Sequence, residues 1–358
     1  MSLKAIYDCG ARHSSSQIGR SANAVNGASI VANAGRGGNT PVMRIDGIST
    51  TASYVSFTNF FEQLFFGGET SHEVYAAARV RMVNSSWGGT GGAFRFFAIM
   101  DVAGNEVFAL GNDSGSSGFD RTVCAYKEGS NVGVVGILSN SLQLCVEMKV
   151  DKGAGTAEVR VEGQDAMSFS GLTWGSAGNP AKVVLGGGIG GVGCPLDWQD
   201  LQVCDGDGVV PNTWFSPLGV VMTQFPTGAG DKSEWTPAGD TPNWKCVDES
   251  PADDFTTTVG SSVAGNEDLY TFPAVDSGVE TVLAVVVAVE GQPATGGGSY
   301  SLQGSCKSSG TLANTATQAG KSSWADNFFV FPTDPHTSAA WAKAAVGSAQ
   351  FGMKHVAA

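Results

Sequence analysis

The first residues in this chain that could carry out catalysis are two glutamates in a strand–turn–strand stretch. Glu147 and Glu158 lie on either side of the turn segment 151–155. Glycoside hydrolysis needs two carboxyl groups that flank one sugar bond, and sandwich-type hydrolases carry them at alternate positions of one strand. An E-x-D-x-x-E pattern is absent here, and we expect Glu147 to be an isolated surface charge. No Ser/His/Asp or Cys/His grouping stands out either, so we predict no catalytic residue.

Motifs for cofactors and metal ions are present only as fragments. Gly186–Gly191 fits G-x-G-x-x-G, but a dinucleotide site needs a helix directly after it, and the following Val192-Gly193-Cys194-Pro195 cannot start one. Asp205–Gly208 lacks the third acidic position and the distal glutamate of a calcium loop. Asp253 and Asp254 are adjacent, so they point apart in an extended chain. We therefore predict no cofactor and no metal ion.

Cysteine and histidine usage favours the same interpretation. The chain has seven cysteines, an odd number, and no two of them are spaced as C-x-x-C. We interpret them as small buried apolar residues of a reduced protein. The four histidines are scattered along the chain, whereas a zinc site needs clustered ligands.

Tryptophans are the candidate contact residues. An indole can stack on a sugar ring, and that alternative applies to Trp214, Trp235, Trp244, Trp324 and Trp341. Packing in a core, between domains or between subunits is the commoner use of such a side chain. On that basis five residues are the candidate interface and packing residues: Trp198, Trp214, Trp235, Trp244 and Trp341.

The elements that carry these residues read as strands. In Leu144–Val150 and Ala157–Glu162 polar and apolar residues alternate around a glycine turn, which predicts a half-buried antiparallel hairpin over Leu144–Gly163. A further strand is expected at Asp197–Val203. Many short strands with glycine turns between them predict a β-sandwich, a scaffold that points away from most enzymes.

Composition and charge narrow the class of protein. The 358 residues include 50 glycines, only 15% are charged, and 42% are hydrophobic, a profile of an all-β protein with a real core. The formal net charge is −13 and no Lys/Arg-rich run occurs, so nucleic acid is an improbable partner. The start of the chain has no apolar signal-like region, and the longest apolar run, Val282–Val289, is too short for a membrane span.

Composition also shifts along the chain. Residues 1–204 predict a jelly-roll sandwich domain. Residues 205–270 hold six of the 13 prolines, and we interpret them as an extended connector anchored by aromatic residues. Residues 271–358 predict a second, smaller β-sandwich domain with one short helix at Ser338–Val346, for which Ser338 is the N-cap and Gly347 the stop.

The order of several segments resembles a known group of proteins. Leu172–Val203, which ends in Trp198-Gln199-Asp200-Leu201-Gln202-Val203, is similar to the closing strand of concanavalin/laminin-G-like jelly rolls, and so is the hairpin. The segments that follow in order are Asn212-Thr213-Trp214-Phe215, Ser233-Glu234-Trp235-Thr236-Pro237, Asn243-Trp244, Val247-Asp248-Glu249, Pro251-Ala252-Asp253-Asp254, Asp268-Leu269-Tyr270, Ala340-Trp341 and Phe351-Gly352. The whole order resembles tailed-bacteriophage virion proteins in which a jelly-roll domain precedes a second β-domain.

The resemblance implies a non-enzymatic structural protein of the virion, assembled in the host cytoplasm. Its partners would be other virion proteins, major capsid or tail proteins, and further copies of itself, with a trimer as one arrangement. Capsid decoration is slightly favoured because the chain lacks the heptads and shaft repeats of a fibre. The alternatives are a tail or baseplate fibre and an adhesin that binds a host glycan. A polysaccharide-degrading enzyme that uses Glu147 or Glu158 is the least favoured hypothesis.

Overall fold

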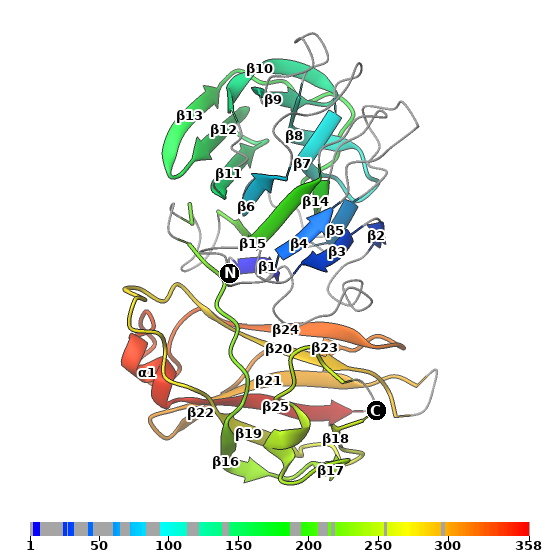
Figure 1. Ribbon diagram of the computed structural model, residues 1–358, viewed down its shortest axis with the longest axis vertical. Coiled ribbons are helices and arrows are strands. Elements are labelled where there is room, and N and C mark those ends of the chain that lie inside the picture. The colour runs from blue at the N-terminus through cyan, green and yellow to red at the C-terminus, as the bar shows by residue number, and fades with distance from the viewer. Residues whose placement is uncertain are drawn as a thin grey trace. The chain divides into compact units, whose positions relative to one another are not determined.

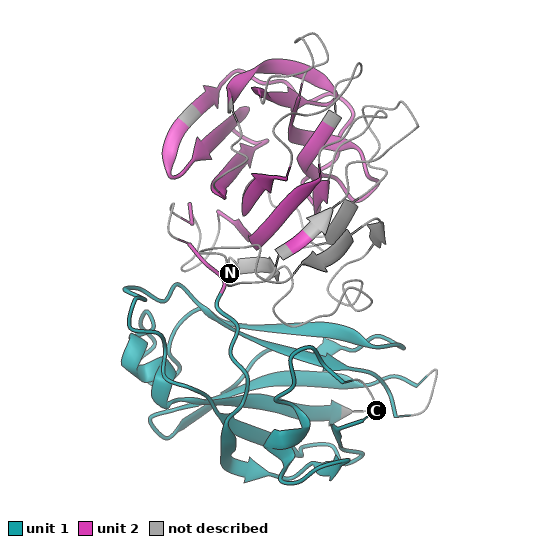
Figure 2. Cartoon of the chain, in the orientation of Figure 1, with its two compact units in different colours: residues 1, 209–211, 222–358 teal, residues 2–208, 212–221 magenta. Residues whose placement is uncertain are grey.

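Two compact β units make up the chain in a computed structural model (Figure 2). The N-terminal unit comprises residues 2–208 and 212–221, and the C-terminal unit comprises residues 209–211 and 222–358. The structure describes residues 3–7, 24–26, 28–31, 42–45, 60–64, 72–83, 94–112, 122–137, 143–186, 195–206, 214–215, 219–253, 256–294 and 298–357.

The N-terminal unit is built from two antiparallel sheets (Figure 1). The strands of sheet A are, in spatial order, β13 (Gln164–Phe169), β12 (Thr156–Val161), β11 (Leu144–Asp151), β6 (Glu73–Met82), β15 (Leu196–Asp205), β4 (Val42–Ile45) and β3 (Ala28–Val31), and β1 (Leu3–Tyr7) also pairs with β15. The strands of sheet B are β10 (Ser130–Ile137), β9 (Thr122–Lys127), β8 (Glu106–Asn112), β7 (Phe94–Met100), β14 (Lys182–Gly186), β5 (Phe60–Leu64) and β2 (Ala24–Asn26).

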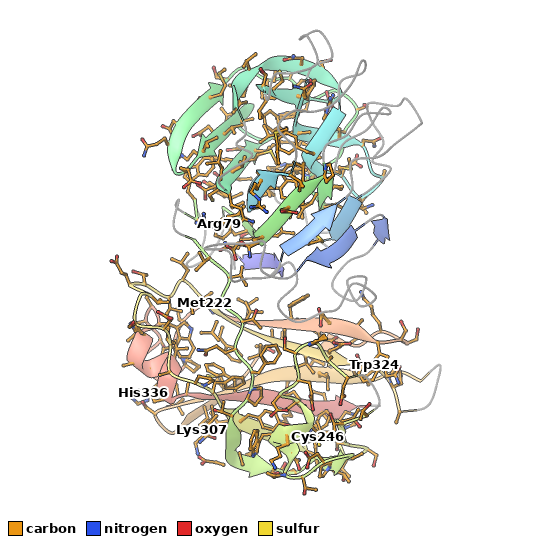
Figure 3. All side chains as sticks on the ribbon, in the orientation of Figure 1. Arg79, Met222, Cys246, Lys307, Trp324 and His336 are labelled. Carbon is orange, nitrogen blue, oxygen red and sulfur yellow. The ribbon has the colours of Figure 1, made fainter. Side chains whose placement is uncertain are left out.

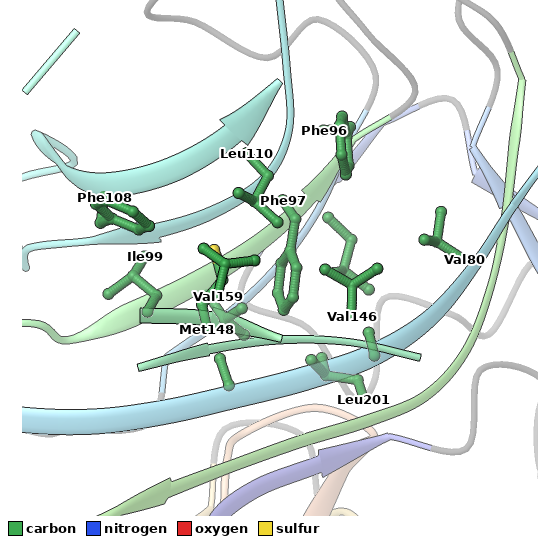
Figure 4. Close-up of a cluster of buried hydrophobic side chains, with 14 of the residues drawn as sticks. Val80, Phe96, Phe97, Ile99, Phe108, Leu110, Val146, Met148, Val159 and Leu201 are labelled. Carbon is green, nitrogen blue, oxygen red and sulfur yellow. The ribbon is translucent and has the colours of Figure 1, made fainter. Parts of the chain in front are cut away.

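The core of this unit is the layer of apolar side chains between the two sheets (Figure 4). Alternate residues of β11 (Val146, Met148 and Val150) point into it and are almost fully buried. From sheet B, Phe97 packs its ring 5.8 Å from that of Trp198, which is 0% exposed. The period-two pattern of the strands therefore decides which side chains enter the core and which stay on the outer face.

The hairpin expected at Leu144–Gly163 is present. β11 and β12 pair in register from Val146 opposite Val161 to Asp151 opposite Thr156. The turn between them is fixed by Asp151, whose carboxylate accepts the Ala154 amide at 2.8 Å. β15 covers the predicted strand at 197–203, but it pairs with β6 rather than with the hairpin. The fold class is thus an all-β sandwich protein with a second β unit.

The C-terminal unit is a smaller set of sheets (Figure 1). Its main sheet contains β16 (Gly228–Ser233), β19 (Glu267–Thr271), β25 (Gln350–Ala357), β21 (Ser301–Ser308) and β22 (Thr311–Asn314), with β23 (Gln318–Ala319) beside β21. Two-stranded sheets are formed by β20 (Val285–Gly291) with β24 (Ala325–Phe331) and by β17 (Thr236–Ala238) with β18 (Thr258–Gly260). The short helices are η3 (Asn243–Cys246) and α1 (Lys343–Ser348).

The segment 205–270 was expected to be a separate connector between two domains, but the structure divides it between the two units. Most of it belongs to the C-terminal unit, because β19 lies between β16 and β25 in the main sheet. One of the two partners of β19 is β25, about eighty residues later in the sequence, with Thr271 opposite Gln350 and Glu267 opposite Lys354. A local pattern could not reveal that pairing. The described residues Trp214, Phe215 and 219–221 belong to the N-terminal unit.

The short helix begins later than predicted. α1 starts at Lys343 and ends at Ser348, so it contains Gly347, the residue expected to stop it. Ser338 is not its N-cap, because its φ of 56° lies in the left-handed region and its amide donates to the Asp334 carbonyl at 2.8 Å. No helix in the described part of the chain is long and apolar enough to span a membrane.

Candidate functional site

The outer side of sheet A carries charged and aromatic side chains in cross-strand rows. They alternate along the strands with core residues such as Val74, Val150 and Val159, each 0% exposed. We call the part built on β6, β11, β12 and β13 the hairpin face. Its residues are Glu73, Tyr75, Lys149, Glu158, Arg160 and Asp165, with Trp214 lying against them.

One row of the hairpin face joins Tyr75, Lys149 and Glu158, which are paired neighbours on β6, β11 and β12. The Lys149 ammonium lies 3.0 Å from Glu73 Oε1 and 3.7 Å from Glu158 Oε1, and 5.4 Å from the centre of the Tyr75 ring. The Tyr75 hydroxyl donates to Glu73 Oε1 at 2.9 Å. The ion pairs of Lys149 and the hydrogen bond of Tyr75 hold these side chains in place on the outer side of the sheet.

The same contacts shift the pKa values of Tyr75 and Lys149. Burial raises the pKa of Tyr75, and the adjacent Glu73 carboxylate raises it further. Burial alone would lower the pKa of Lys149, but the hydrogen bond to Glu73 outweighs it and raises that pKa. Lys149 is therefore a cation and Tyr75 a neutral hydrogen-bonding phenol throughout the neutral range.

A second row brings an indole over the sheet. Arg160 places its guanidinium carbon 4.1 Å from the centre of the Trp214 ring and donates from Nε to Asp165 Oδ1 at 2.7 Å. The Trp214 and Tyr75 rings meet edge to face, with centroids 5.3 Å apart. Trp214 and Arg160 both remain partly exposed. The hairpin face therefore offers aromatic surface beside polar groups.

Trp214 is held in position by described residues that follow it in the chain. We call Trp214, Phe215 and 219–221 the strap. The Phe215 amide donates to Glu147 Oε1 at 2.9 Å, and the Val221 amide donates to Asp200 Oδ1 at 3.1 Å. Phe215 is 2% exposed. Two carboxylates of sheet A thus fasten the strap across the outer side of the sheet.

The prediction that Glu147 is an isolated surface charge is wrong. Its outward direction was inferred correctly from the alternation of β11, but the strap covers it and leaves the residue 1% exposed. Asp200 was not anticipated at all. A register shift between Gln199 and Gln202 and a φ of 54° turn Asp200 towards the strap and Arg79.

Arginines farther along β6 are also neutralised by carboxylates. Arg79, labelled in Figure 3, approaches Asp200 with Nε to Oδ2 at 3.3 Å, and Arg81 approaches Asp197 at 2.6 Å. With the pairs of Lys149 and Arg160, every cation among the described side chains of β6, β11 and β12 has a carboxylate partner. The outer side of the sheet is therefore rich in charge but locally balanced.

The other candidate tryptophans do not join the hairpin face. Trp198 lies in the core, and Trp341 is buried in the C-terminal unit, where its Nε1 donates to the Phe331 carbonyl at 2.8 Å. Trp235 donates from Nε1 to the Asn266 carbonyl at 3.1 Å and packs edge to face on His355. Trp244 is half-buried in η3. Among these five, only Trp214 lies on the hairpin face, where it packs on Tyr75 and beneath the Arg160 guanidinium.

Several motif fragments fall partly outside the described residues, namely 187–191, 207–208 and Asp254. Asp205 is buried, and Asp253 accepts hydrogen bonds from Thr257. The cysteines among the described residues are buried and form no disulfide with one another: Cys124, Cys145, Cys204, Cys246 and Cys306. Within the described ranges no group of three or more His, Cys, Asp or Glu residues could hold a metal ion.

Sequence reasoning missed Tyr75 and Arg160. The signal for Arg160 was available, because it alternates with Val159 and Val161 on the predicted hairpin and so had to point outward. Tyr75 was hidden in the stretch 71–83, whose alanines also admit a helix. The approach of Trp214 to both had no local signal.

Comparisons with known proteins concern the fold only. No family model matches the chain, and no curated protein matches it. Among solved structures, it is similar to the binding domain of Paraclostridial Mosquitocidal Protein 1, at 11% identity over 52% of this chain and 44% of that chain, with a TM-score of 0.37. It is also similar to Trypanosoma rangeli sialidase, at 9% identity over 50% of this chain and 26% of that chain, with a TM-score of 0.35.

A third similar structure is domain 4 of AbnA, an extracellular arabinanase from Geobacillus stearothermophilus, in complex with arabinotriose. It shares 13% identity over 57% of this chain and 92% of that chain, with a TM-score of 0.35. The chain spans less than half of each of the first two proteins. At these identities the similarity concerns the β-sandwich architecture and no activity.

One expectation is corrected by these comparisons. The chain was predicted not to be an enzyme, partly because a sandwich scaffold points away from catalysis, yet a sialidase is among the similar structures. The assumption that the two glutamates are unrelated also fails. Glu147 lies opposite Arg160 and Glu158 opposite Lys149, so both carboxylates project from one face at diagonal positions of adjacent strands. Such diagonal neighbours are about 7–8 Å apart.

Proposed function

We propose that the protein binds a glycan through the hairpin face of its N-terminal unit. The observation that carries this proposal is the partly exposed Trp214 indole, which packs edge to face on the buried Tyr75 ring and lies on the outer side of sheet A beside Lys149, Arg160 and Glu158. Aromatic rings can accept the C–H side of a sugar, and charged side chains can exchange hydrogen bonds with its hydroxyls. A few convergent polar groups beside aromatic surface are typical of ligand sites.

Pre-organisation supports the same proposal. Trp214 is fixed by the strap, which Glu147 and Asp200 hold through backbone amides. Arg160 is held by Asp165, and Lys149 by Glu73. Because these side chains are ordered before a ligand arrives, binding costs little additional side-chain entropy.

The biological setting that we propose is the virion of a tailed bacteriophage, with the protein as an exterior component. The support is the sequence order from residue 197 to residue 272 and beyond, which resembles such virion proteins. In that setting the partners would be capsid or tail proteins and further copies of the chain. An adhesin on the tail and a decoration protein on the capsid both present a binding face outward.

The binding proposal can be tested on a glycan array with the full-length protein, followed by calorimetry on the best ligand. We expect Trp214→Ala and Arg160→Ala to weaken binding by at least about tenfold, as for central contact residues. Trp244→Ala is the matched control, because it removes a half-buried indole from the other unit. Absence of binding at millimolar sugar, or equal losses in all three variants, would overturn the proposal.

Two further measurements test whether the protein cleaves the bound glycan and whether it is part of a virion. Incubation of the bound oligosaccharide with the protein, with analysis of the products by mass spectrometry, reports whether the glycan is cleaved. Antibody labelling of intact virions, seen by electron microscopy, tests the setting. Label on the head supports decoration, label on the tail supports an adhesin, and particles that never carry label contradict a virion role.

A further inference from the structure

We infer that the ligand of the hairpin face is an uncharged glycan rather than an acidic one. This inference rests on the proposed function and specifies its ligand class. It follows from two observations: the cations of the hairpin face are paired with carboxylates, and the carboxylates are the more exposed members of those pairs.

An acidic sugar needs a cation that is free to receive its carboxylate or sulfate. The two cations of the hairpin face are both engaged, Lys149 with Glu73 and Glu158, and Arg160 with Asp165. Arg160 also has its guanidinium over the Trp214 ring. An anionic ligand would meet cations whose charge is already balanced by carboxylates of the protein, so it would either compete with those carboxylates or lie close to them, and its gain in charge pairing would be small.

The carboxylates are also the more exposed partners. The Asp165 side chain is 67% exposed against 26% for Arg160, and those of Glu73 and Glu158 are 31% and 29% exposed against 19% for Lys149. With three carboxylates and two cations the hairpin face is net negative, and the whole chain carries −13. Like charges meeting at an interface oppose binding.

A neutral sugar has no such conflict. Its hydroxyls can donate to the outer oxygens of Glu158 or Asp165 and accept from Lys149 or Arg160 without breaking the existing pairs. The partly exposed Trp214 indole contributes contact area that does not depend on ligand charge, whereas the Tyr75 ring is buried and supports the indole edge to face. Affinity for such a ligand should therefore depend weakly on salt.

The test compares matched oligosaccharides that differ only in charge, such as a neutral hexose chain and its uronate form, or sialylated and desialylated lactosamine. With full-length protein, we expect the neutral member to bind at least about tenfold more tightly, with little change between low and high salt. The double variant Glu158→Gln/Asp165→Asn removes two of the three carboxylates of the hairpin face, and it should reduce the preference for the neutral member, because it helps the acidic member more than the neutral one.

The outcomes separate this inference from the proposed function. Tighter binding of the acidic member, lost in Trp214→Ala and steeply weakened by salt, would overturn the inference while the hairpin face remains a glycan site. Binding that does not respond to Trp214→Ala, or no binding of either member, would overturn both. Circular dichroism of each variant confirms that the sandwich is intact before its affinity is compared.

Discussion

Several carboxylates among the described residues accept hydrogen bonds from backbone amides of distant segments. Glu147 and Asp200 hold the strap, and Glu128 accepts the amides of Gly175 and Ala177, each at 2.9 Å. In the C-terminal unit Asp268 accepts the amides of Glu234 and Trp235. Glycine-rich loops have few side chains to pack, so charge-assisted hydrogen bonds are an effective way to fix them. The acidic composition thus has a structural use.

Replacing Glu147 and replacing Glu158 should have different effects on the stability of the protein. Glu147→Ala leaves the buried Phe215 amide without its acceptor, and we expect it to lower the free energy of unfolding by about 1–3 kcal/mol. Glu158→Ala removes a partly exposed charge and should change it by less than about 0.5 kcal/mol. Urea unfolding followed by tryptophan fluorescence measures both, and equal effects would contradict the assigned role of Glu147.

Glu128 should make stability depend on pH. Burial would raise its pKa, but hydrogen bonds from the Ala177 and Gly175 amides and from Lys127 lower it to about 2, against an ordinary value of 4.5. Because the folded pKa is depressed, its contribution is complete above the ordinary value and is lost as pH falls from there towards 2.

We therefore expect Glu128→Gln to cost about 1–3 kcal/mol of unfolding free energy at neutral pH, a difference from the parent protein that shrinks in acid. The exposed Glu280, replaced by Gln, is the control and should show no such convergence. Thermal unfolding at a series of pH values gives the comparison. A constant difference between parent and Glu128→Gln at all pH values would exclude the carboxylate as the cause.

At the scale of elements, hairpins in both units use the same turn chemistry. Glu162 and Gly163 link β12 to β13, and Ser309 and Gly310 link β21 to β22, with positive φ at both positions of each pair. Two-residue turns of this kind match the twist of the strands they join. The second position needs glycine because an L-residue with a Cβ is strained at φ near +86°.

Gly310 offers a clean test of that strain. A Cβ built there meets nothing within 4 Å, so replacement by alanine costs only the backbone strain. We expect Gly310→Ala to lower the unfolding free energy by about 1 kcal/mol. Gly260→Ala is matched, because it also has open space but no positive φ. Equal melting temperatures for the two variants would contradict the claim that the turn requires glycine at position 310.

At the scale of the whole molecule, the two units have separate sheets. β16 to β25 pair only with one another, and the N-terminal strands do the same. The C-terminal unit also has its own buried apolar cluster, formed around Trp341 and Phe351 with Cys306 and Phe331. A unit with complete sheets and a core of its own meets the physical requirements for independent folding.

We therefore expect residues 222–358 to fold when expressed alone. The fragment should give a β-type circular dichroism spectrum and a cooperative thermal transition that matches one of the transitions of the full chain. A matched fragment that ends at residue 260 lacks β19 and β25, the central strands of the main sheet, and should remain unfolded. A disordered 222–358 fragment would contradict the assignment of two independent units.

Alternation and turn residues were enough to predict the all-β class, the hairpin at Leu144–Gly163 and the strand that contains Asp197–Val203. These depend on local rules, because a period of two and a glycine turn specify a strand pair wherever they occur. The same rule placed Glu147 on the outer side of the sheet. It could not show that a segment almost seventy residues later would cover it.

In the hairpin the sequence by itself determined which side chains face the core and which face outward, because the residues of a pleated strand alternate between its two faces. Tertiary structure alone decided what those outward side chains meet. The insertion of β6 between β11 and β15, the bulge at Asp200 and the path of the strap bring Tyr75, Arg160 and Trp214 together. Such contacts depend on loop closure over long sequence separations, which local propensity does not encode.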